Sequence, residues 1–309
     1  MYYIALDGGT TNTRLRLITD GAVSAAKKLP LGAGDAGGKA PWSAAVAKAA
    51  KELLSENNLA QRDIAAVIAS GMVTSEYGLF PLAHLPAPAG IADLHAGMAE
   101  TKIDGLTIPC FFIPGIKQNA ASAEDADMMR GEEAEVIGLL SFGGAGCTYV
   151  LPGTHCKHVT VDGEERISRF QTFMTGEMIA ALSSATILRD AVDLSVKGYD
   201  PDALLRGYDA AAKNGLGAAL FKTRIMKNLF AESPLACYSF FLGVLLADEI
   251  QSLARGEAKK VLIAGKPSLR DPMLALIEKR TDLVAVPCDA DAIENASVLG
   301  AIRIFEYEA

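Results

Sequence analysis

The first thirty residues alternate between apolar segments and short polar turns. Residues 2–7 form an apolar run typical of a buried strand, and residues 13–19 alternate polar and apolar positions as a half-exposed strand does. A turn at residues 8–12 separates the two, and Asp20-Gly21 predicts a hairpin that leads into a third strand at 23–29. The chain therefore opens with three consecutive strands joined by turns.

The same pattern occurs again in the second half of the chain. Strands are predicted at residues 147–151, 156–161 and 165–173, with a turn at 152–155 and a second Asp-Gly hairpin at Asp162-Gly163. The two glycine-containing turns lie roughly 145 residues apart. This repetition predicts a duplicated two-domain architecture, and the alternative is that hairpins with Asp-Gly turns recur by chance.

Most of the remaining chain shows helical spacing of apolar residues, interrupted by short buried strands. The expected helices are 43–55, 132–140, 176–188, 202–229, 239–255, 269–279 and 292–305, and the expected strands are 64–69, 260–264 and 283–287. Residues 80–90 predict an irregular loop, and the glycine-rich segment 32–38 predicts a mobile one. Strands alternating with helices indicate an α/β fold.

Composition narrows the class of protein. The 309 residues suit two domains of ordinary size, and 50% hydrophobic with 21% charged residues allow a full core. A net charge of −8 without a long basic run argues against a nucleic-acid partner or an anionic membrane surface. The longest apolar stretch, Phe240 to Ala247, is too short to span a bilayer. Five cysteines without a CxxC pair, and no leader pattern at the start, predict a cytoplasmic protein with reduced thiols.

The first glycine- and threonine-rich turn directly follows an aspartate. It comprises Gly8, Gly9, Thr10, Thr11 and Asn12. The glycines let the backbone approach an anion closely, and the threonine hydroxyls add hydrogen-bond donors. Asp7 ends the preceding strand, where it can hold a hydrated Mg²⁺ that faces phosphates. No GKS or GKT sequence follows, so this is not a Walker A loop; it is either a phosphate-binding turn or an ordinary hairpin.

The second turn repeats this chemistry in the other half of the chain. Thr154 and the backbone N–H groups around Gly153 can bind the transferred phosphate or the β-phosphate. Lys157 can add positive charge, although strand alternation can equally point it to solvent. His155 is a candidate donor to a ligand or else a structural histidine.

Two adjacent glutamates begin the helix expected at 132–140. A kinase needs a carboxylate near the acceptor hydroxyl to take its proton, and Glu132 or Glu133, just after Gly131, can supply one. The alternative, which these residues by themselves favour, is that both glutamates complement the positive end of the helix dipole.

Two further strand ends carry candidate binding turns. In the segment from Gly265 to Ser268, the glycine lets a nucleoside lie against the backbone. In the segment from Met72 to Ser75, backbone N–H groups and the Ser75 hydroxyl can meet a sugar acid. Such turns are common, so neither identifies a ligand by itself.

Six segments, taken in their order, resemble the 2-dehydro-3-deoxygalactonokinase family. They are DGGTTN, SGMVTSEYG, MRGEE, PGTHCK, FQTFMTGE and FFLGVLLADEI, and the matches run from about residue 2 to residue 301. The combination of MRGEE, PGTHCK and FQTFMTGE is the most specific part of the resemblance.

The resemblance implies two RNase H-like (actin/hexokinase-like ATPase) domains flanking an ATP cleft. It also implies ATP-dependent phosphorylation of 2-dehydro-3-deoxy-D-galactonate on its 6-hydroxyl, in galactonate and galactose catabolism. We expect residues 1–140 to form an N-terminal domain, mainly on the substrate side, with the C-terminal helix packing back on it. We expect residues 141–309 to form the nucleotide-side domain, with a helical insertion at about 176–236.

The family also implies cofactors and residue roles. ATP and Mg²⁺ are the implied cofactors, with Asp7 holding the metal through water and Glu132 or Glu133 as the base. The residues implied for ATP and its phosphates are Gly8, Gly9, Thr10, Thr11, Asn12, Gly153, Thr154, Lys157, Gly265 and Ser268. The residues implied for the sugar acid are Met72, Ser75, Arg14 and His155.

The sequence departs from the family in two places. The family usually has an aromatic residue after the first aspartate, where this chain has Gly8, and segment 32–38 is unusually rich in glycine. Two alternatives therefore stay open: a kinase of another sugar or sugar acid on this fold, and a non-catalytic sugar or nucleotide sensor. The presence of Asp7, Thr154 and Glu132 favours an enzyme. The expected partners are a small sugar acid and ATP, without nucleic acid or membrane, and a homodimer is one assembly that the sequence allows.

Overall fold

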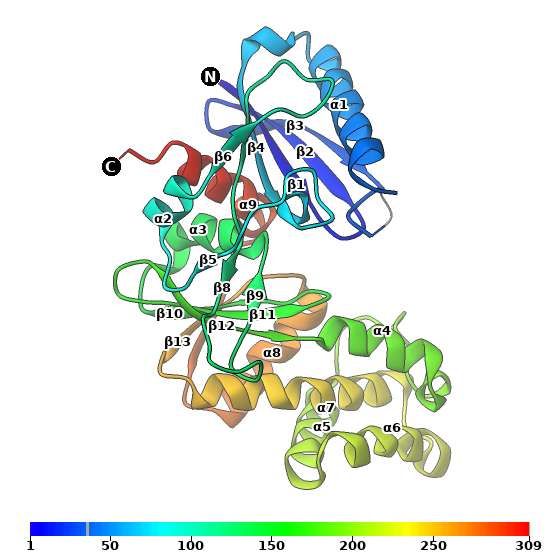
Figure 1. Ribbon diagram of the computed structural model, residues 1–309. Coiled ribbons are helices and arrows are strands. Elements are labelled where there is room, and N and C mark those ends of the chain that lie inside the picture. Colours follow the sequence, from blue (N-terminus) through cyan, green and yellow to red (C-terminus); the bar gives the residue numbers. More distant parts are fainter. Residues whose placement is uncertain (35–36, 309) are drawn as a thin grey trace. The chain divides into compact units, whose positions relative to one another are not determined.

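The computed structural model describes residues 1–34 and 37–308 and divides into two compact units (Figure 1). The first unit comprises Met1–Ala145, Val161–Arg169 and Asp291–Ala309, and the second comprises Gly146–Thr160 and Phe170–Ala290. The first unit thus continues to Ala145 and takes in two further segments from the second half of the chain. The mobile loop expected at 32–38 lies partly outside the described residues.

A six-stranded sheet forms the centre of the first unit. Its strands are β1 (Tyr2–Gly8), β2 (Thr13–Thr19), β3 (Ala22–Leu29), β4 (Ile64–Gly71), β6 (Ala99–Thr101) and β7 (Cys110–Phe112), in the order β3-β2-β1-β4-β7-β6. β1 pairs antiparallel with β2 and parallel with β4, so β1 and β4 end at the same edge of the sheet. The three opening strands and the strand expected at 64–69 are confirmed.

Helix α1 (Lys39–Glu56) covers part of this sheet (Figure 1). Its buried side chains include Trp42, Val46 and Leu53, which join Ile4 and Val67 of the sheet in one apolar core. Trp42 also donates its indole N–H to the buried Thr13 hydroxyl at 2.9 Å, so its polar edge is satisfied in the core.

The first unit contains further short elements. They are helix α2 (Ile91–Ala96), the 3₁₀ turns Gln61–Asp63 and Met72–Thr74, and a small sheet of β5 (Leu85–Pro86), β8 (Ile116–Lys117) and β9 (Met128–Met129). These two- and three-residue strands were not predicted, because a strand that short shows too little alternation to stand out from a loop. The irregular loop expected at 80–90 holds one of them, β5.

Helices α3 (Glu132–Gly143) and α9 (Ala290–Phe305) pack closely through glycines. A Cβ on Gly138 would lie 1.9 Å from the carbonyl oxygen of Ala296, and one on Gly300 would lie 1.7 Å from that of Ala134. Arg303 of α9 also donates to the Ile137 carbonyl at 2.8 Å. The C-terminal helix is therefore fixed to the helix that carries the candidate glutamates.

The second unit is built on a five-stranded sheet, although Val161 of β11 and Ile167–Arg169 of β12 are grouped with the first unit. Its strands are β10 (Cys147–Leu151), β11 (Cys156–Val161), β12 (Ile167–Phe173), β13 (Lys260–Ile263) and β14 (Val284–Pro287), in the order β12-β11-β10-β13-β14. Numbered within the sheet, this order is third, second, first, fourth, fifth. The first sheet has the same order apart from its added edge strand β6. The duplication predicted from the repeated strand pattern is confirmed.

Five α-helices lie among the strands of the second unit. They are α4 (Thr175–Ala185), followed by the 3₁₀ turn Ile187–Asp190, then α5 (Pro201–Asn214), α6 (Leu216–Phe230), α7 (Pro234–Arg255) and α8 (Pro267–Arg280). The prediction of one helix over 202–229 is wrong. Gly215 has φ +79°, a conformation that ends α5 and that L-residues rarely adopt, and α6 begins directly after it.

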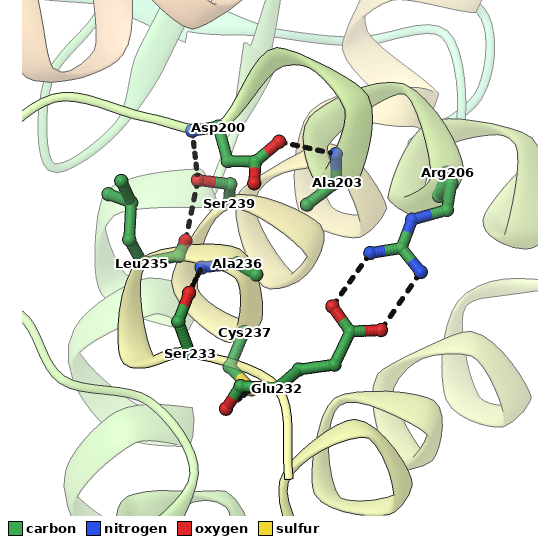
Figure 2. Close-up of polar contacts among 9 residues, drawn as sticks. All are labelled: Asp200, Ala203, Arg206, Glu232, Ser233, Leu235, Ala236, Cys237 and Ser239. Atoms are coloured by element: carbon green, nitrogen blue, oxygen red, sulfur yellow. Dashed lines mark hydrogen bonds and ion pairs between the residues drawn. The ribbon is translucent and has the colours of Figure 1, made fainter. Parts of the chain in front are cut away.

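Side-chain caps fix the ends of α5 and α7 (Figure 2). The Asp200 carboxylate accepts the Ala203 N–H at 3.0 Å, and the Ser233 hydroxyl accepts the Ala236 N–H at 3.1 Å. Ser239 accepts the Asp200 N–H at 2.7 Å and donates to the Leu235 carbonyl, which joins the two helices. Such caps satisfy backbone groups that a helix leaves unpaired at its ends.

Helix α7 is the core helix of the second unit. By length and hydropathy alone it would qualify as a membrane span, but 78% of its most apolar window is buried by the rest of the protein. Gly243 of α7 lies against α5, since a Cβ there would be 2.0 Å from the Leu204 carbonyl oxygen. This burial is typical of a core helix, which passes the same hydropathy test.

The α3–α9 contact gives a first testable prediction. Gly138→Ala forces a methyl group onto the Ala296 carbonyl, and we expect a loss of about 2 kcal/mol or more in the free energy of unfolding. Gly217→Ala, on α6, is the matched control, because a Cβ there meets nothing within 4 Å. It should be neutral or stabilising by up to about 1 kcal/mol. Urea denaturation of the full chain measures both, and an unchanged Gly138→Ala variant would refute the close packing.

Candidate active site

Three glycines bring three elements of the first unit together. Gly8 and Gly71 are paired across β1 and β4, and a Cβ on Gly71 would lie 2.5 Å from the Gly8 carbonyl oxygen. A Cβ on Gly131, which precedes α3, would lie 3.2 Å from the Gly71 Cα. Gly71 and Gly131 have φ values of +84° and +113°, which favour glycine. The ends of β1 and β4 therefore adjoin the start of α3.

The same packing explains why a glycine follows the first aspartate. A Cβ on Gly8 would lie 2.4 Å from the Val73 side chain and 3.2 Å from the Trp42 ring. No side chain fits at this position without moving both neighbours, so the aromatic residue that the family usually has here has no room.

The first glycine-threonine turn is held by the glycine-rich segment that follows β3. Ala33 donates its N–H to the Gly9 carbonyl at 3.1 Å, and Gly34 donates to the Thr10 carbonyl at 2.9 Å. Gly32 approaches so closely that a Cβ would lie 2.5 Å from the Gly9 oxygen. Thr10 and Thr11 remain exposed. The described part of this segment therefore supports the turn. The Thr10 hydroxyl is available to a ligand, and the Thr11 hydroxyl, which accepts from the Asn12 amide at 2.8 Å, can still donate.

Asp7 lies between this turn and two arginines of β2. Its Oδ2 is 3.5 Å from Nη1 of Arg14, and its side chain is 29% exposed. Burial raises the pKa of Asp7, while the charges of Arg14 and Arg16 lower it. Arg16 was not predicted as a site residue. Its Nη1 is buried and, among the described residues, has no hydrogen-bond partner. Arg16 lies two residues after Arg14 on β2, so strand alternation places both side chains on one face, and this was the available signal.

The two adjacent glutamates of α3 have different surroundings. Glu133 is 0% exposed, and both of its carboxylate oxygens accept the Gly131 N–H at 2.8 Å. Burial and then the charge of Glu132 raise the pKa of Glu133 to about 8, although backbone N–H groups and Arg130 oppose the shift. Glu132 is only partly buried, and its Oε2 accepts the Arg130 N–H at 3.0 Å. Glu133 thus occupies the helix start, as the dipole alternative predicts, and Glu132 is the more accessible carboxylate.

A third glutamate of α3, Glu135, was not predicted as a site residue. Burial, followed by the charges of Glu132 and Asp7, raises the pKa of Glu135 to about 7. Its position three residues after Glu132, on the same face of a helix, was the signal that could have revealed it. The pKa of Glu135 therefore responds to the charges of both proposed site carboxylates, Glu132 and Asp7.

Arg130 fixes the turn that follows β4. Its Nη1 donates to the Thr74 hydroxyl at 2.6 Å and its Nη2 to the Leu82 carbonyl at 3.0 Å. Ser75 is 8% exposed and donates its hydroxyl to the Met72 carbonyl at 2.7 Å, so only its acceptor capacity is available to a ligand. Met72 is partly buried beside it. The turn is thus rigidly held, and its use for a sugar acid stays a prediction.

The second turn lies on the start of α4 within the second unit. A Cβ on Gly176 would lie 2.3 Å from the Gly153 oxygen and 2.7 Å from the Thr154 Cα. Gly153 and Thr154 are exposed. His155, also exposed, has its Nε2 2.8 Å from the Glu177 carboxylate, which favours the structural interpretation of this histidine.

Lys157 does not point to solvent, so that alternative is wrong. It is 5% exposed, and its ammonium group donates to the Thr172 hydroxyl and lies 5.9 Å from the centre of the Phe170 ring. Both partners lie on the neighbouring strand β12, so the Lys157 ammonium group is buried against the sheet. A role of Lys157 in phosphate binding stays a prediction.

The turn after β13 lies beside the second glycine-threonine turn. β10 and β13 are parallel neighbours, so both strands end at one edge of the sheet. Gly265 has φ +92°, and a Cβ there would lie 3.1 Å from the Pro152 ring. Ser268 is exposed near the start of α8. The second unit thus groups Gly153, Thr154, Gly265 and Ser268 at one edge.

The carboxylates of the first unit suit a hydrated metal ion rather than a direct cage. In the described residues no group of three or more His, Cys, Asp or Glu side chains is arranged to hold a metal. Mg²⁺ usually keeps several waters and binds through one or two carboxylates and substrate phosphates. The partly exposed Asp7 beside the exposed hydroxyls of the first turn fits this mode.

Comparison with solved structures identifies the class of fold. A proposed 2-dehydro-3-deoxygalactonokinase from Sinorhizobium meliloti matches with a TM-score of 0.78 and 24% identity over 99% of both chains. The activator of a 2-hydroxyisocaproyl-CoA dehydratase from Clostridium difficile, with bound ADPNP, matches with a TM-score of 0.52 and 13% identity over 97% of this chain and 92% of the other. The predicted actin/hexokinase-like ATPase fold is confirmed.

The family follows from the sequence comparisons. The family model described as 2-keto-3-deoxy-galactonokinase matches residues 7–303, so the chain belongs to that family. A probable 2-dehydro-3-deoxygalactonokinase of Rhizobium meliloti (strain 1021) is 34% identical over 62% of this chain and 59% of its own length. The chain therefore matches less than two thirds of that relative. The 2-dehydro-3-deoxygalactonokinase of Escherichia coli (strain K12) is 27% identical over 81% of this chain and 80% of its own length.

The raised pKa of Glu133 predicts a pH dependence of stability. The folded state holds this proton between the ordinary pKa of 4.5 and about 8, whereas the unfolded state releases it, so stability falls as the pH rises through this window. Glu133→Gln removes this effect. Relative to wild type, the variant should gain on the order of 1–3 kcal/mol in free energy of unfolding between pH 5 and pH 8.5.

Urea denaturation at the two pH values measures this gain. The exposed Glu100→Gln is the control and should shift by less than about 0.5 kcal/mol between them. A difference between Glu133→Gln and wild type that is the same at both pH values would contradict the assignment.

Proposed function

We propose that this protein transfers a phosphate from ATP to the 6-hydroxyl of 2-dehydro-3-deoxy-D-galactonate. Membership of the 2-keto-3-deoxy-galactonokinase family supports the activity and the substrate. The actin/hexokinase-like ATPase fold supports the use of ATP. The reaction would belong to galactonate and galactose catabolism and would take place in the cytoplasm. The five buried cysteine thiols are consistent with that compartment.

The contrast between Glu132 and Glu133 is the observation that carries the proposed mechanism. Glu133 is fully enclosed and bound to the Gly131 N–H, so no acceptor hydroxyl reaches it. Glu132 is partly accessible and adjoins the strand end that carries Asp7, because Gly131 packs on Gly71 and Gly71 on Gly8. Glu132 therefore takes the proton from the sugar hydroxyl as the phosphoryl group is transferred.

Phosphate binding falls to the two glycine-threonine turns. The exposed hydroxyls of Thr10 and Thr11 and the backbone of residues 8–12 serve from the first unit, and Gly153 and Thr154 serve from the second. Mg²⁺, when bound, neutralises charge on the phosphates, and Asp7 orients its water shell. Gly265 and Ser268, beside the second turn, serve the adenosine side of the nucleotide.

The sugar acid needs donors for its carboxylate as well as a base for its hydroxyl. Arg14 is half exposed beside Asp7, so its guanidinium can provide them. Backbone groups of Met72 and the acceptor oxygen of Ser75 complete the set. His155 is paired with Glu177, which favours a structural role over a direct contact with the sugar acid. A homodimer remains part of the proposal, and size measurement in solution tests it.

A substrate panel tests the reaction. With ATP and Mg²⁺, we expect ADP release with 2-dehydro-3-deoxy-D-galactonate at a kcat/KM at least about tenfold above that with epimeric or non-keto sugar acids. A coupled ADP assay measures it. A preference for another sugar acid would show that the proposed substrate is wrong. Calorimetric binding of the sugar acid without ADP formation would show that the protein is a sensor and not an enzyme.

Base catalysis by Glu132 is tested by one isosteric substitution. Glu132→Gln should lower kcat by about 10²- to 10⁴-fold, because the amide cannot take the proton, and should change ADP affinity by less than about twofold. Glu133→Gln should lower kcat far less, and the exposed Glu100→Gln serves as the neutral control. Steady-state kinetics and ADP calorimetry measure these effects. A Glu132→Gln variant that turns over at near wild-type rate would eliminate Glu132 as the base.

A further inference from the structure

One carboxylate is fully buried in the core helix of the second unit. Glu249 is 0% exposed on α7, whose buried residues are mostly apolar. An unpaired buried carboxylate costs on the order of several kcal/mol, so such a group is retained only with close partners. Its neighbour Asp248 is exposed, as acidic residues usually are. The partners of Glu249 should therefore show why a carboxyl group is placed here.

Glu249 joins two elements that flank the second glycine-threonine turn. Its Oε2 lies 2.9 Å from Nε2 of His158 on β11, and its Oε1 accepts a hydrogen bond from the hydroxyl of Thr175. His158 is 5% exposed and Thr175 is 3% exposed, so both contacts are shielded from water. Thr175 is the first residue of α4. The carboxylate therefore fixes the start of α4 against β11.

The start of α4 in turn holds the exposed turn. Directly after Thr175, Gly176 packs on the backbone of Gly153 and Thr154, with 2.3 Å between its hypothetical Cβ and the Gly153 oxygen. The next residue, Glu177, donates its N–H to the Thr154 carbonyl at 3.2 Å, and its carboxylate pairs with His155. Three consecutive residues of α4 thus connect the buried carboxylate to the turn.

The turn has few restraints of its own. Gly153, Thr154 and His155 are all exposed, and the contact of the Cys156 thiol with the Gly153 carbonyl is long, at 3.7 Å. An unrestrained turn must lose conformational entropy when a ligand orders it, and this loss weakens binding. If α4 holds the turn in its binding conformation before the ligand arrives, this loss of entropy on binding is reduced.

We propose that Glu249 and Thr175 are positioning residues for nucleotide binding, which act through α4 to keep Gly153 and Thr154 in the conformation that binds phosphates. The inference rests on the proposed function, because it takes a nucleotide polyphosphate as the ligand of this turn. It adds two residues that contact no substrate, and it explains why a threonine, a glycine and a glutamate occur in succession at the start of α4.

Removal of one hydroxyl tests the proposal. Thr175→Val keeps the shape of the side chain but takes away the donor to Glu249. We expect it to weaken ADP binding, measured by calorimetry on the full chain with Mg²⁺, by about tenfold, and to raise the KM for ATP similarly. The KM for the sugar acid should stay within about twofold, since the first unit supplies its proposed ligands. Thr175→Ser restores the hydroxyl and should restore most of the affinity.

Two controls separate positioning from general destabilisation. Asp248→Asn changes the exposed neighbour on the same helix and should leave all three constants as in wild type. Glu249→Gln keeps the volume and should weaken ADP binding in the same direction as Thr175→Val. The proposal is overturned by ADP affinity within about twofold of wild type in Thr175→Val, or by parallel losses in ATP and sugar-acid binding.

Amide hydrogen exchange provides a second measurement that does not need a sugar substrate. Thr175→Val should speed exchange in peptides that cover Gly153 to Cys156 while leaving α7 protected. Unchanged exchange there would overturn the positioning role. A wild type that binds ADP but phosphorylates no sugar acid would refute the proposed function alone. A wild type that binds no adenine nucleotide would refute both.

Discussion

Close backbone packing of three glycines is the constraint on which the candidate active site depends. Gly8, Gly71 and Gly131 lie at the ends of two parallel strands and at the start of a helix. Gly8 and Gly71 have no room for a Cβ, and Gly131 is tightly packed and has a φ of +113°, which favours glycine. Because these backbones touch, Asp7 and Glu132, which neighbour the glycines, lie on adjoining elements at one edge of the sheet. A side chain at any of the three positions would separate the proposed metal-orienting aspartate from the proposed base.

The second unit uses the same device at the corresponding strand ends. Gly176 packs on the second turn and Gly265 packs on Pro152, again at distances that exclude a Cβ or nearly so. The two sheets share their strand order, so the duplicated fold repeats both a topology and a way of fixing a turn. The second unit also has a buried carboxyl group, Glu249, which binds His158 and the first residue of α4, Thr175.

Much of the fold could be predicted from the sequence because its strands and helices are long and periodic. Two Asp-Gly hairpins marked the repeated three-strand pattern, and both sheets confirm it. The break at Gly215 was missed because a single glycine within a helical pattern usually leaves the helix intact, and only its positive φ shows that the helix ends. The short strands β5, β6 and β7 were missed because two or three residues carry too little periodicity.

The site was less predictable, because burial and contact decide the roles of its residues. Glu132 and Glu133 are equivalent in the sequence, and only the turn of the helix encloses one of them. Arg16 and Glu135 gain their importance from the charge of Asp7, which lies on a different element from either. Lys157 was predicted either to face solvent or to bind phosphate. The structure buries it beside Thr172, so it does not face solvent, and it lies in no evident position to bind phosphate.

A crystal structure of the protein with ADP, Mg²⁺ and 2-dehydro-3-deoxy-D-galactonate would test the central claim most directly. The account predicts that the 6-hydroxyl oxygen lies about 2.6–3.2 Å from the Glu132 carboxylate, with the β-phosphate on the glycine-threonine turns. A sugar acid bound with its 6-hydroxyl facing away from Glu132, or a nucleotide that contacts neither turn, would contradict it.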